Sequence, residues 1–302
     1  MSNVIVVGDV HGCLEELREL LERAKYVPNV DKVYLLGDLV DRGPDSAGVV
    51  QYARKHNLAC VKGNHDDKHI RFRKHMLVEK AGGKKNPMKF RDTKLDDHLA
   101  LTDDDIAWMD QLPVAIFPPE LPGWVLVHAG FNPFHGSTRN ITRESLFIRY
   151  IDAKTKKTVG LDKDLQAPAN SEWWFDHWYE PIKVMYGHAV HSYQDPLIVN
   201  NCYGIDTGCC FGGRLTGAIF TDPTKEPYFL QIDAYEDYAK RFDTDRSAYF
   251  VDGPTRQNFN ASSDDDAIKI FNERYPQHEI LFSENSEKEM RTVFVRRHDT
   301  QG

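Results

Sequence analysis

Along the first 182 residues, the pattern of apolar and polar positions predicts strands and helices that follow one another in alternation. The stiff run Val4–Val7 is typical of a buried strand. In residues 13–25, apolar side chains return every three or four positions, which predicts a helix with one buried face. Further strands are predicted at 32–38 and 124–130, a strand that runs into a loop at 58–66, and a further helix at 44–56.

After residue 182 the pattern changes to short strands separated by turn residues. Alternating elements followed by a run of strands predict an α/β fold, a sandwich of two packed mixed β-sheets flanked by helices. We expect this sandwich to occupy residues 1–235. The rest, 236–302, is expected to be an extension of unknown role, with a weak helical pattern at 267–275 and a strand pattern at 292–297.

Composition narrows the class of protein. The chain has 302 residues, of which 41% are hydrophobic and 28% charged, and this suits one large domain or two modest ones. It shows neither an apolar run of membrane-spanning length nor a signal-peptide pattern, so no membrane association is expected. The five cysteines lack disulfide-framework and zinc-ribbon spacing, which favours a reducing cytoplasm. Nothing indicates an obligate protein partner.

Charge is unevenly distributed along the chain. The net charge of −8 argues against general coating of nucleic acid. Residues 68–94, however, hold ten Lys or Arg and two acids, which gives this segment a charge of +8 and leaves −16 for the rest. Such a run is either a solvated face or a lid or guide for an anionic substrate.

Side chains of metal-binding types follow five of the predicted strands, in the stretches GDVHG, GDLVDRG, GNHD, VHAG and YGH. Carboxylates, an amide oxygen and imidazoles together suit borderline divalent ions such as Mn²⁺, Fe²⁺, Zn²⁺ or Ni²⁺ rather than Ca²⁺. The ligands are too many for one ion with open positions, so we expect two ions that share a bridging carboxylate. The candidate ligands are Asp9, His11, Asp38, Asn64, His128 and His188.

In this order and spacing the five motifs resemble those of the calcineurin-like metallophosphoesterase superfamily, and GDLVDRG resembles the form of its phosphoprotein-phosphatase branch. Residues 200–220 are similar to bacterial phosphatases related to diadenosine tetraphosphatase and to the phosphatase module of polynucleotide kinase-phosphatase. The resemblance covers about residues 1–235. It implies metals at the strand ends and hydrolysis of phosphoesters by a hydroxide that bridges two ions, with Mn²⁺ preferred.

The resemblance also implies a role for each residue. Asp38 would bind both ions, Asp9 and His11 the first, and the remaining ligands Asn64, His128 and His188 the second. His65 would protonate the leaving group, with Asp41 orienting its ring, and Arg42 would bind phosphate. Asp206 matches an acidic position near the site. A second phosphate-binding arginine is expected among Arg139, Arg143 and Arg149, and His191 is an extra imidazole without an assigned use.

Three functions remain open. The preferred one is a two-metal phosphatase for nucleotides, nucleic-acid ends or other small phosphoesters, and the basic segment 68–94 could guide a nucleic-acid end. A protein Ser/Thr phosphatase is the alternative, and a non-catalytic scaffold is remote because every expected ligand is present. Trp173, Trp174 and Trp178 precede the YGH strand, and burial in the core is favoured over stacking on a base.

Overall fold

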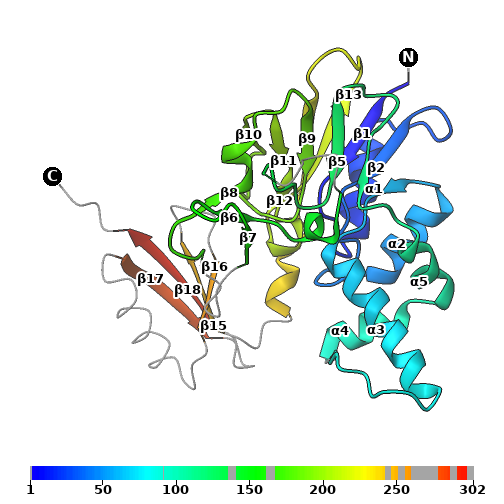
Figure 1. Ribbon diagram of the computed structural model, residues 1–302, viewed down its shortest axis with the longest axis vertical. Coiled ribbons are helices and arrows are strands. Elements are labelled where there is room, and N and C mark those ends of the chain that lie inside the picture. The colour runs from blue at the N-terminus through cyan, green and yellow to red at the C-terminus, as the bar shows by residue number, and fades with distance from the viewer. Residues whose placement is uncertain are drawn as a thin grey trace.

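A computed structural model describes residues 2–90, 92–134, 141–160, 167–241, 246–250, 256–259, 278–285 and 291–297. Two packed mixed β-sheets form its centre, which confirms the predicted fold class (Figure 1). The first sheet has the strand order β12 (Asp206–Thr207), β13 (Arg214–Phe220), β1 (Val4–Val7), β2 (Lys32–Leu35), β3 (Ala59–Cys60), and β14 (Tyr228–Asp233) also pairs with β13. The second has the order β10 (Leu197–Val199), β11 (Cys202–Gly204), β9 (Lys183–Tyr186), β5 (Trp124–Val127), β4 (Ala115–Ile116).

Parallel pairing within each sheet brings strand ends together. In the first sheet β1, β2 and β3 run parallel, and in the second β5, β9 and β11 do so. The carboxyl ends of parallel neighbours lie at the same edge of their sheet, and this edge is where open α/β sheets bind ligands. The loops that leave these strands therefore converge.

Strand residues alternate between two apolar layers. Val4 and Val6 face the second sheet, where they pack with Trp124 and Leu126. Ile5 and its alternate neighbours face the helices α1 (Leu14–Arg23) and α2 (Ser46–Lys55). Burying a side chain of this size stabilises the fold by about 1.5–3 kcal/mol, so both layers hold the first sheet in place.

Three helices extend beyond the first sheet, at the lower right of Figure 1: α3 (Asn64–Lys80), α4 (Asp92–Ala100) and α5 (Asp103–Asp110). The strand expected to run into a loop over 58–66 ends at Cys60, and the part expected as loop already becomes helix at Asn64, where α3 begins. Gly63 is extended, with φ −93° and ψ 168°, and its N–H donates to the carboxylate of Asp66 at 2.8 Å. An acid at the third helical position that binds back to the preceding backbone is a helix-start signal.

The outer face of the second sheet packs against a smaller sheet and two one-turn helices. Trp174 and Trp178 are buried there against Tyr186 and Phe131, whereas Trp173 is half-buried and packs against Tyr150. Core packing is thus the role of Trp174 and Trp178. The elements are η2 (Arg143–Leu146), β6 (Tyr150–Asp152), β7 (Thr158–Val159), β8 (Ser171–Trp173) and η3 (Trp174–His177).

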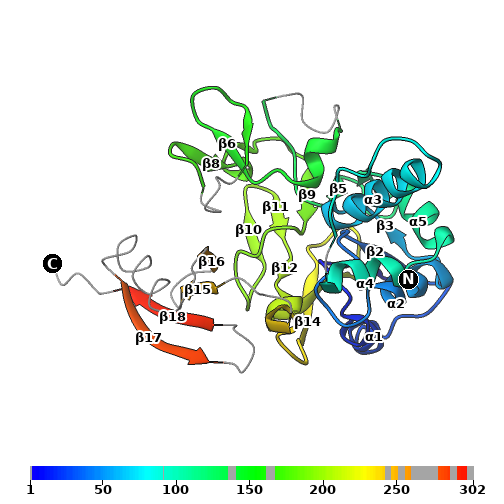
Figure 2. The same ribbon diagram turned by 90° about the horizontal axis from the view of Figure 1, so that it is seen from below.

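The C-terminal residues include a further sheet, drawn away from α3 and α4 in Figures 1 and 2. The strand predicted at 292–297 matches β18, whereas the helical pattern at 267–275 lies outside the described residues. In the described part of the chain, no helix is long and apolar enough to cross a membrane. The remaining elements are η4 (Cys209–Phe211), η5 (Tyr238–Arg241), β15 (Arg246–Phe250), β16 (Arg256–Phe259), β17 (His278–Asn285) and β18 (Arg291–Arg297).

Replacing Trp174 by alanine tests whether this side chain stabilises the hydrophobic core. We expect Trp174→Ala to lower the free energy of unfolding by about 3–5 kcal/mol, because it leaves a large cavity. Tyr179→Ala is the control, since Tyr179 is 83% exposed, and it should change stability by less than about 0.5 kcal/mol. Urea unfolding measures both. A stable Trp174→Ala protein with a raised KM for nucleotides would instead favour stacking on a base.

Candidate metal centre

Every predicted site residue follows the carboxyl end of a parallel strand. Loops from both sheets thus contribute to one site, as the sequence motifs predict. The residues are Asp9 and His11 after β1; Asp38, Asp41 and Arg42 after β2; Asn64 and His65 after β3; His128 after β5; His188 after β9; and Asp206 after β11.

Several of these residues have left-handed backbone conformations, which side chains other than glycine seldom adopt. The φ angles are 45° at His11, 49° at Asp38, 71° at Asp41, 74° at Arg42 and 66° at His188. Such conformations cost on the order of 1–3 kcal/mol each and persist where neighbours enforce them. The loops after β1 and β2 do so, because the His11 N–H donates to the Asp38 carbonyl at 2.8 Å.

Two glycines of the motifs permit close approach between the loops. A Cβ on Gly63 would lie 2.1 Å from the Asp38 nitrogen, and a Cβ on Gly187 would lie 1.9 Å from Oδ1 of Asp9. Backbone without a side chain is therefore required directly before Asn64 and His188. The loops of the second sheet and of β3 could not otherwise reach the carboxylates that follow β1 and β2.

Asp38 lies between two groups of potential metal ligands. One group is His11, Asp38 and His65, and the other is Asp38, His128 and His188; within each group the ligand atoms lie within 4.8 Å of one another. Oδ2 of Asp38 is 3.5 Å from Nε2 of His11 and 3.4 Å from Nε2 of His128. Asp38 therefore belongs to both groups, and its carboxylate could contact an ion held by either one.

Backbone carbonyls orient two of the imidazoles. Nδ1 of His11 lies 2.8 Å from the Val40 carbonyl, and Nδ1 of His128 lies 2.8 Å from the Leu36 carbonyl. Each Nδ1 therefore donates its hydrogen, and Nε2 points toward Asp38. Metal-binding histidines are commonly oriented by such a hydrogen bond from the other ring nitrogen. Oδ1 of Asn64 lies 2.9 Å from Nε2 of His128, so the amide oxygen faces the same space.

The pKa values of Asp38 and His128 indicate that the site favours a positive charge. Burial disfavours the Asp38 carboxylate, but His128 and His65 outweigh it and hold the pKa of Asp38 well below its usual range. Burial would likewise lower the pKa of His128, yet Asp38 and Asp9 raise it to about 10. A proton on His128 thus compensates the carboxylates, and divalent cations could replace it. The donor set therefore fits metal ions.

The imidazoles of His11 and His188 are neutral. Burial and the charge of Arg42 hold the pKa of His11 well below its usual range, and burial and Arg149 do the same for His188. Neutral imidazole is the form that binds metals.

Asp9 lies beside these groups without belonging to either. Both of its oxygens accept the His188 backbone N–H, at 3.1 and 3.0 Å, and Oδ2 is 4.0 Å from Nε2 of His11. The structure thus places His65, rather than Asp9, in the group with His11 and Asp38. Burial and the nearby Asp206 carboxylate raise the pKa of Asp9 well above its usual range. The Asp206 side chain is buried and accepts the Gly208 N–H at 3.0 Å.

His65 contacts the two residues with which it is predicted to act. Its Nδ1 forms a short hydrogen bond with Oδ2 of Asp41, and its Nε2 lies 3.4 Å from Nη2 of Arg42. Burial lowers the pKa of His65 to about 3, a shift that Asp38 opposes and Arg42 reinforces. Arg42 also lies over the Phe211 ring, at 4.6 Å from its centroid.

The structure separates the three candidates for a second arginine. Arg149 reaches the site, where its Nε donates to Nε2 of His188 at 3.1 Å. Arg143 instead pairs with Asp67 at 2.6 Å, and Arg139 lies outside the described residues. His191 joins an aromatic cluster, 3.1 Å from the Tyr186 hydroxyl, and contributes nothing to the metal groups.

Two residues of the basic segment, which lie outside the five sequence motifs, also contact the site. Nε2 of His69 lies 2.7 Å from Oδ1 of Asp41, and the Lys94 ammonium forms a short ion pair with Oδ2 of the same carboxylate. The signal for His69 was its spacing, because it follows His65 by one turn of α3. The sequence gives no such signal for Lys94, because this residue lies on α4 and reaches Asp41 only through the tertiary fold.

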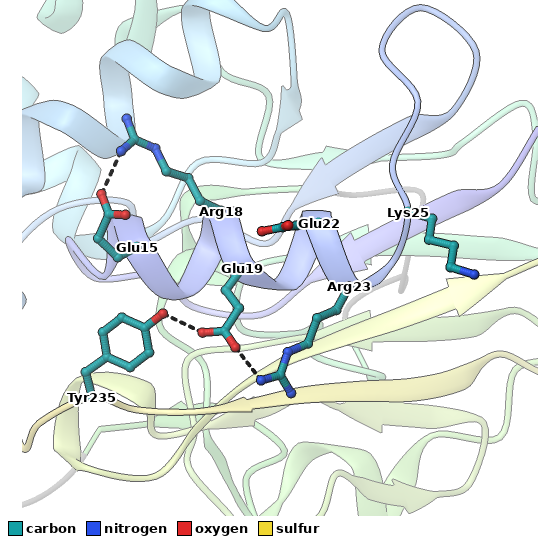
Figure 3. A pocket seen from close by; sticks show the side chains of 7 residues that line it. All are labelled: Glu15, Arg18, Glu19, Glu22, Arg23, Lys25 and Tyr235. Carbon is teal, nitrogen blue, oxygen red and sulfur yellow. Dashed lines mark hydrogen bonds and ion pairs between the residues drawn. The ribbon is translucent and has the colours of Figure 1, made fainter.

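A pocket on the outer side of α1 is lined mainly by charged side chains, several of which pair with one another (Figure 3). Arg18 pairs with Glu15 at 2.6 Å, and Glu19 pairs with Arg23 and accepts from Tyr235. These paired side chains need no ligand to satisfy them. None of the predicted site residues lines this pocket.

Comparisons with known proteins agree with the geometry. A model of the calcineurin-like phosphoesterase family matches residues 2–210. A symmetrical bis(5'-nucleosyl)-tetraphosphatase of Photorhabdus laumondii is 29% identical, over 75% of this chain and 95% of its own. The asymmetrical bis(5'-nucleosyl)-tetraphosphatase PrpE of Oceanobacillus iheyensis is 31% identical, over 73% and 89%. A crystal structure provisionally assigned as a diadenosine tetraphosphatase has a TM-score of 0.62 and 25% identity, and covers 78% of this chain and 95% of its own.

Removing the charge of Asp38 tests the shared carboxylate. We expect Asp38→Asn to lose bound divalent metal and to lower turnover by at least about 10²-fold, because the amide is neutral and keeps only one acceptor oxygen. Metal content after dialysis is measured by mass spectrometry. Asp195→Asn is the control with the same change of charge at an exposed position, and it should keep its metal. Equal metal content in the two variants would contradict a bridging role.

Proposed function

Because the chain belongs to the calcineurin-like phosphoesterase family and is therefore a phosphoester hydrolase, we propose that it acts on nucleotides, with dinucleoside polyphosphates as the favoured class. The position of Asp38 between two ligand groups carries the catalytic part of this proposal. The substrate class is supported by the two bis(5'-nucleosyl)-tetraphosphatases that align over most of their length.

The family implies divalent metals, and we propose two ions, with Mn²⁺ preferred and Fe²⁺, Zn²⁺ or Ni²⁺ as alternatives. Asp38, His11 and His128 would hold them, together with Asp9, Asn64 and His188. Two ions in such a site bind phosphoryl oxygens and lower the pKa of water. The mixed oxygen and nitrogen donors suit borderline ions.

Two arginines would orient the phosphoryl group. Arg42 reaches His65 and Arg149 reaches His188, so the guanidinium groups approach the centre from opposite ligand groups. Each can donate two parallel hydrogen bonds to phosphate, which a lysine cannot do. Both interact electrostatically with buried Asp206, which would help to orient them.

His65 would protonate the leaving oxygen. The short bond from Nδ1 to Asp41 fixes the ring, and Nε2 is left facing Arg42 and Asp38. Burial lowers the pKa of His65 to about 3, so the protonated ring would need a negative charge beside it. The Asp41 carboxylate then stabilises the imidazolium.

A substrate panel with Mn²⁺ tests this function. We expect kcat/KM to be higher for diadenosine tetraphosphate than for a phosphoserine peptide, para-nitrophenyl phosphate or its bis ester. EDTA should abolish turnover and added Mn²⁺ restore it. Product analysis separates symmetrical cleavage, which yields two ADP, from asymmetrical cleavage, which yields ATP and AMP. Preference for the phosphopeptide would favour the protein phosphatase alternative, and EDTA-resistant turnover would contradict the metals.

The basic segment 68–94 could extend the substrate range to nucleic-acid ends. Many of its cations are already paired, for example Arg71 with Asp67 and Lys74 with Asp110. Four lysines are exposed and form no ion pair among the described residues: Lys80, Lys84, Lys85 and Lys89. We propose that these lysines attract a polyanionic substrate toward the rim of the site.

Replacing these four lysines by alanine tests that role. We expect KM to rise for a 3'-phosphorylated oligonucleotide and to stay unchanged for para-nitrophenyl phosphate, and added salt should mimic the change because capture releases counterions. Replacement of Lys25, Lys32, Lys55 and Lys157, exposed lysines elsewhere, removes the same charge and is the matched control. Unchanged kinetics in both variants and across salt would leave small phosphoesters as the substrates.

For the organisation of the whole chain, we propose a catalytic domain at 1–235 and an extension at 236–302. We also propose that the protein works in the cytoplasm. The family match, which ends at residue 210, supports the first part. Contacts of the first core continue slightly further, since the Tyr238 hydroxyl donates to Glu16 at 2.7 Å. All five cysteines are buried and free, which suits a reducing compartment.

A further inference from the structure

The Asp41 carboxylate is bound on both oxygens by three residues from the helices α3 and α4. Oδ2 accepts from His65 and from Lys94, and Oδ1 accepts from His69. His69 is completely buried on α3. The carboxylate that orients His65 is therefore itself held, from its other oxygen, by a residue of the basic segment.

Behind His69 the contacts continue through a buried relay, which we define as His69, His98 and Arg73. Nδ1 of His69 lies 3.2 Å from Nδ1 of His98, and Nε of Arg73 lies 3.0 Å from Nε2 of His98. His98 is completely buried, and Arg73 is 9% exposed. The relay thus joins α3 to α4, which lie next to each other in Figure 1.

The direction of every hydrogen bond in this relay follows from Arg73. A guanidinium has only N–H donors, so Nε2 of His98 must accept. The hydrogen of His98 then sits on Nδ1 and is donated to Nδ1 of His69, which in turn carries its own hydrogen on Nε2 and donates it to Asp41. Burial lowers the pKa of His69 to about 4 and that of His98 to about 3, so both rings are neutral, as this pattern requires.

Arg73 is anchored independently. It pairs with Asp103, and its Nη2 donates to the carbonyls of His98 and Leu101, at 3.3 and 2.9 Å. These contacts fix the position of the Arg73 guanidinium, which always carries a positive charge. With Oδ1 of Asp41 bound to His69, Oδ2 faces Lys94 and His65, and from the His65 ring it accepts the Nδ1 hydrogen.

We propose that His69, aligned by His98 and Arg73, is a positioning residue that fixes Asp41 and thereby the tautomer and orientation of His65. The inference rests on the proposed role of His65 as the acid. It assigns part of the basic segment to the catalytic machinery rather than to capture of substrate. The general reason is that outer hydrogen-bond partners hold a reactive imidazole in one tautomer.

The test compares variants of similar size with and without a donor. His69→Leu removes the donor, His69→Gln can keep one, and His75→Ala changes a half-exposed histidine further along α3 as the control. We expect His69→Leu to lower kcat on phenyl phosphate by about 10–100-fold, the size seen for outer-shell partners. On para-nitrophenyl phosphate, whose leaving group hardly needs a proton, the loss should be less than about threefold. His69→Gln should recover part of the loss, and His75→Ala should match the parent.

Two further measurements separate this inference from the proposed function. His65→Ala should show the same dependence on leaving group, and adding His69→Leu to it should cost nothing more, because both act as one unit. If His65→Ala loses activity equally on both substrates, the acid role is wrong. Nitrogen NMR of the histidines then still decides the positioning role, since His69→Leu should change the tautomer of His65. Equal loss on both substrates for His69→Leu, additive losses, or an unchanged His65 tautomer would overturn it.

Discussion

The structure depends on the way in which the Asp38 carboxylate is fixed where the loops of two sheets meet. The backbone N–H groups of Asp38 and Leu39 donate to the carboxylate of Asp66, at 3.0 and 2.9 Å. Oδ1 of Asp38 accepts the backbone N–H of His65 at 2.8 Å. Only Oδ2 remains free to face His11 and His128. Asp66 also accepts the Gly63 N–H, so a single buried acid ties the loop after β2 to the start of α3. Asp66 therefore holds the loop that carries Asp38 and takes no place among the ligands.

Much of the fold and site could be predicted because it is encoded locally. The continuous apolar run Val4–Val7 predicts a strand that is buried on both faces, and the helical spacing in 13–25 predicts a helix with one buried face. The structure buries these faces. The ligands were identifiable because each follows a strand, and all of them except His128 adjoin a glycine in the sequence. Gly63 and Gly187 are required where a loop passes against a carboxylate of another loop, so the short motifs record contacts between distant segments.

The parts that could not be predicted depend on where helices lead after they leave the site. GNHD looks like the end of a strand, yet Asn64 opens α3 because Asp66 caps the helix. Residues 68–94 form a run of positive charge in the sequence, but the fold gives its members different uses. Arg73 is anchored in the interior, Lys94 reaches Asp41, and Lys84 remains exposed. Periodicity alone cannot tell these apart, because the return of α4 onto α3 is a tertiary contact.

Strain explains why the site needs this support. His11, Asp38, Asp41, Arg42 and His188 all have left-handed backbone conformations, and together they cost several times the roughly 1–3 kcal/mol of one such residue. A lone loop could relax out of that state. Here each strained loop is bonded to another, as His11 is to Asp38 and His188 is to Asp9. The helices α3 and α4 add to this from outside, since His69 and Lys94 hold Asp41. Relaxing one loop would break hydrogen bonds in the next, so the sheets, the helices and the strained loops stabilise one common arrangement of the site.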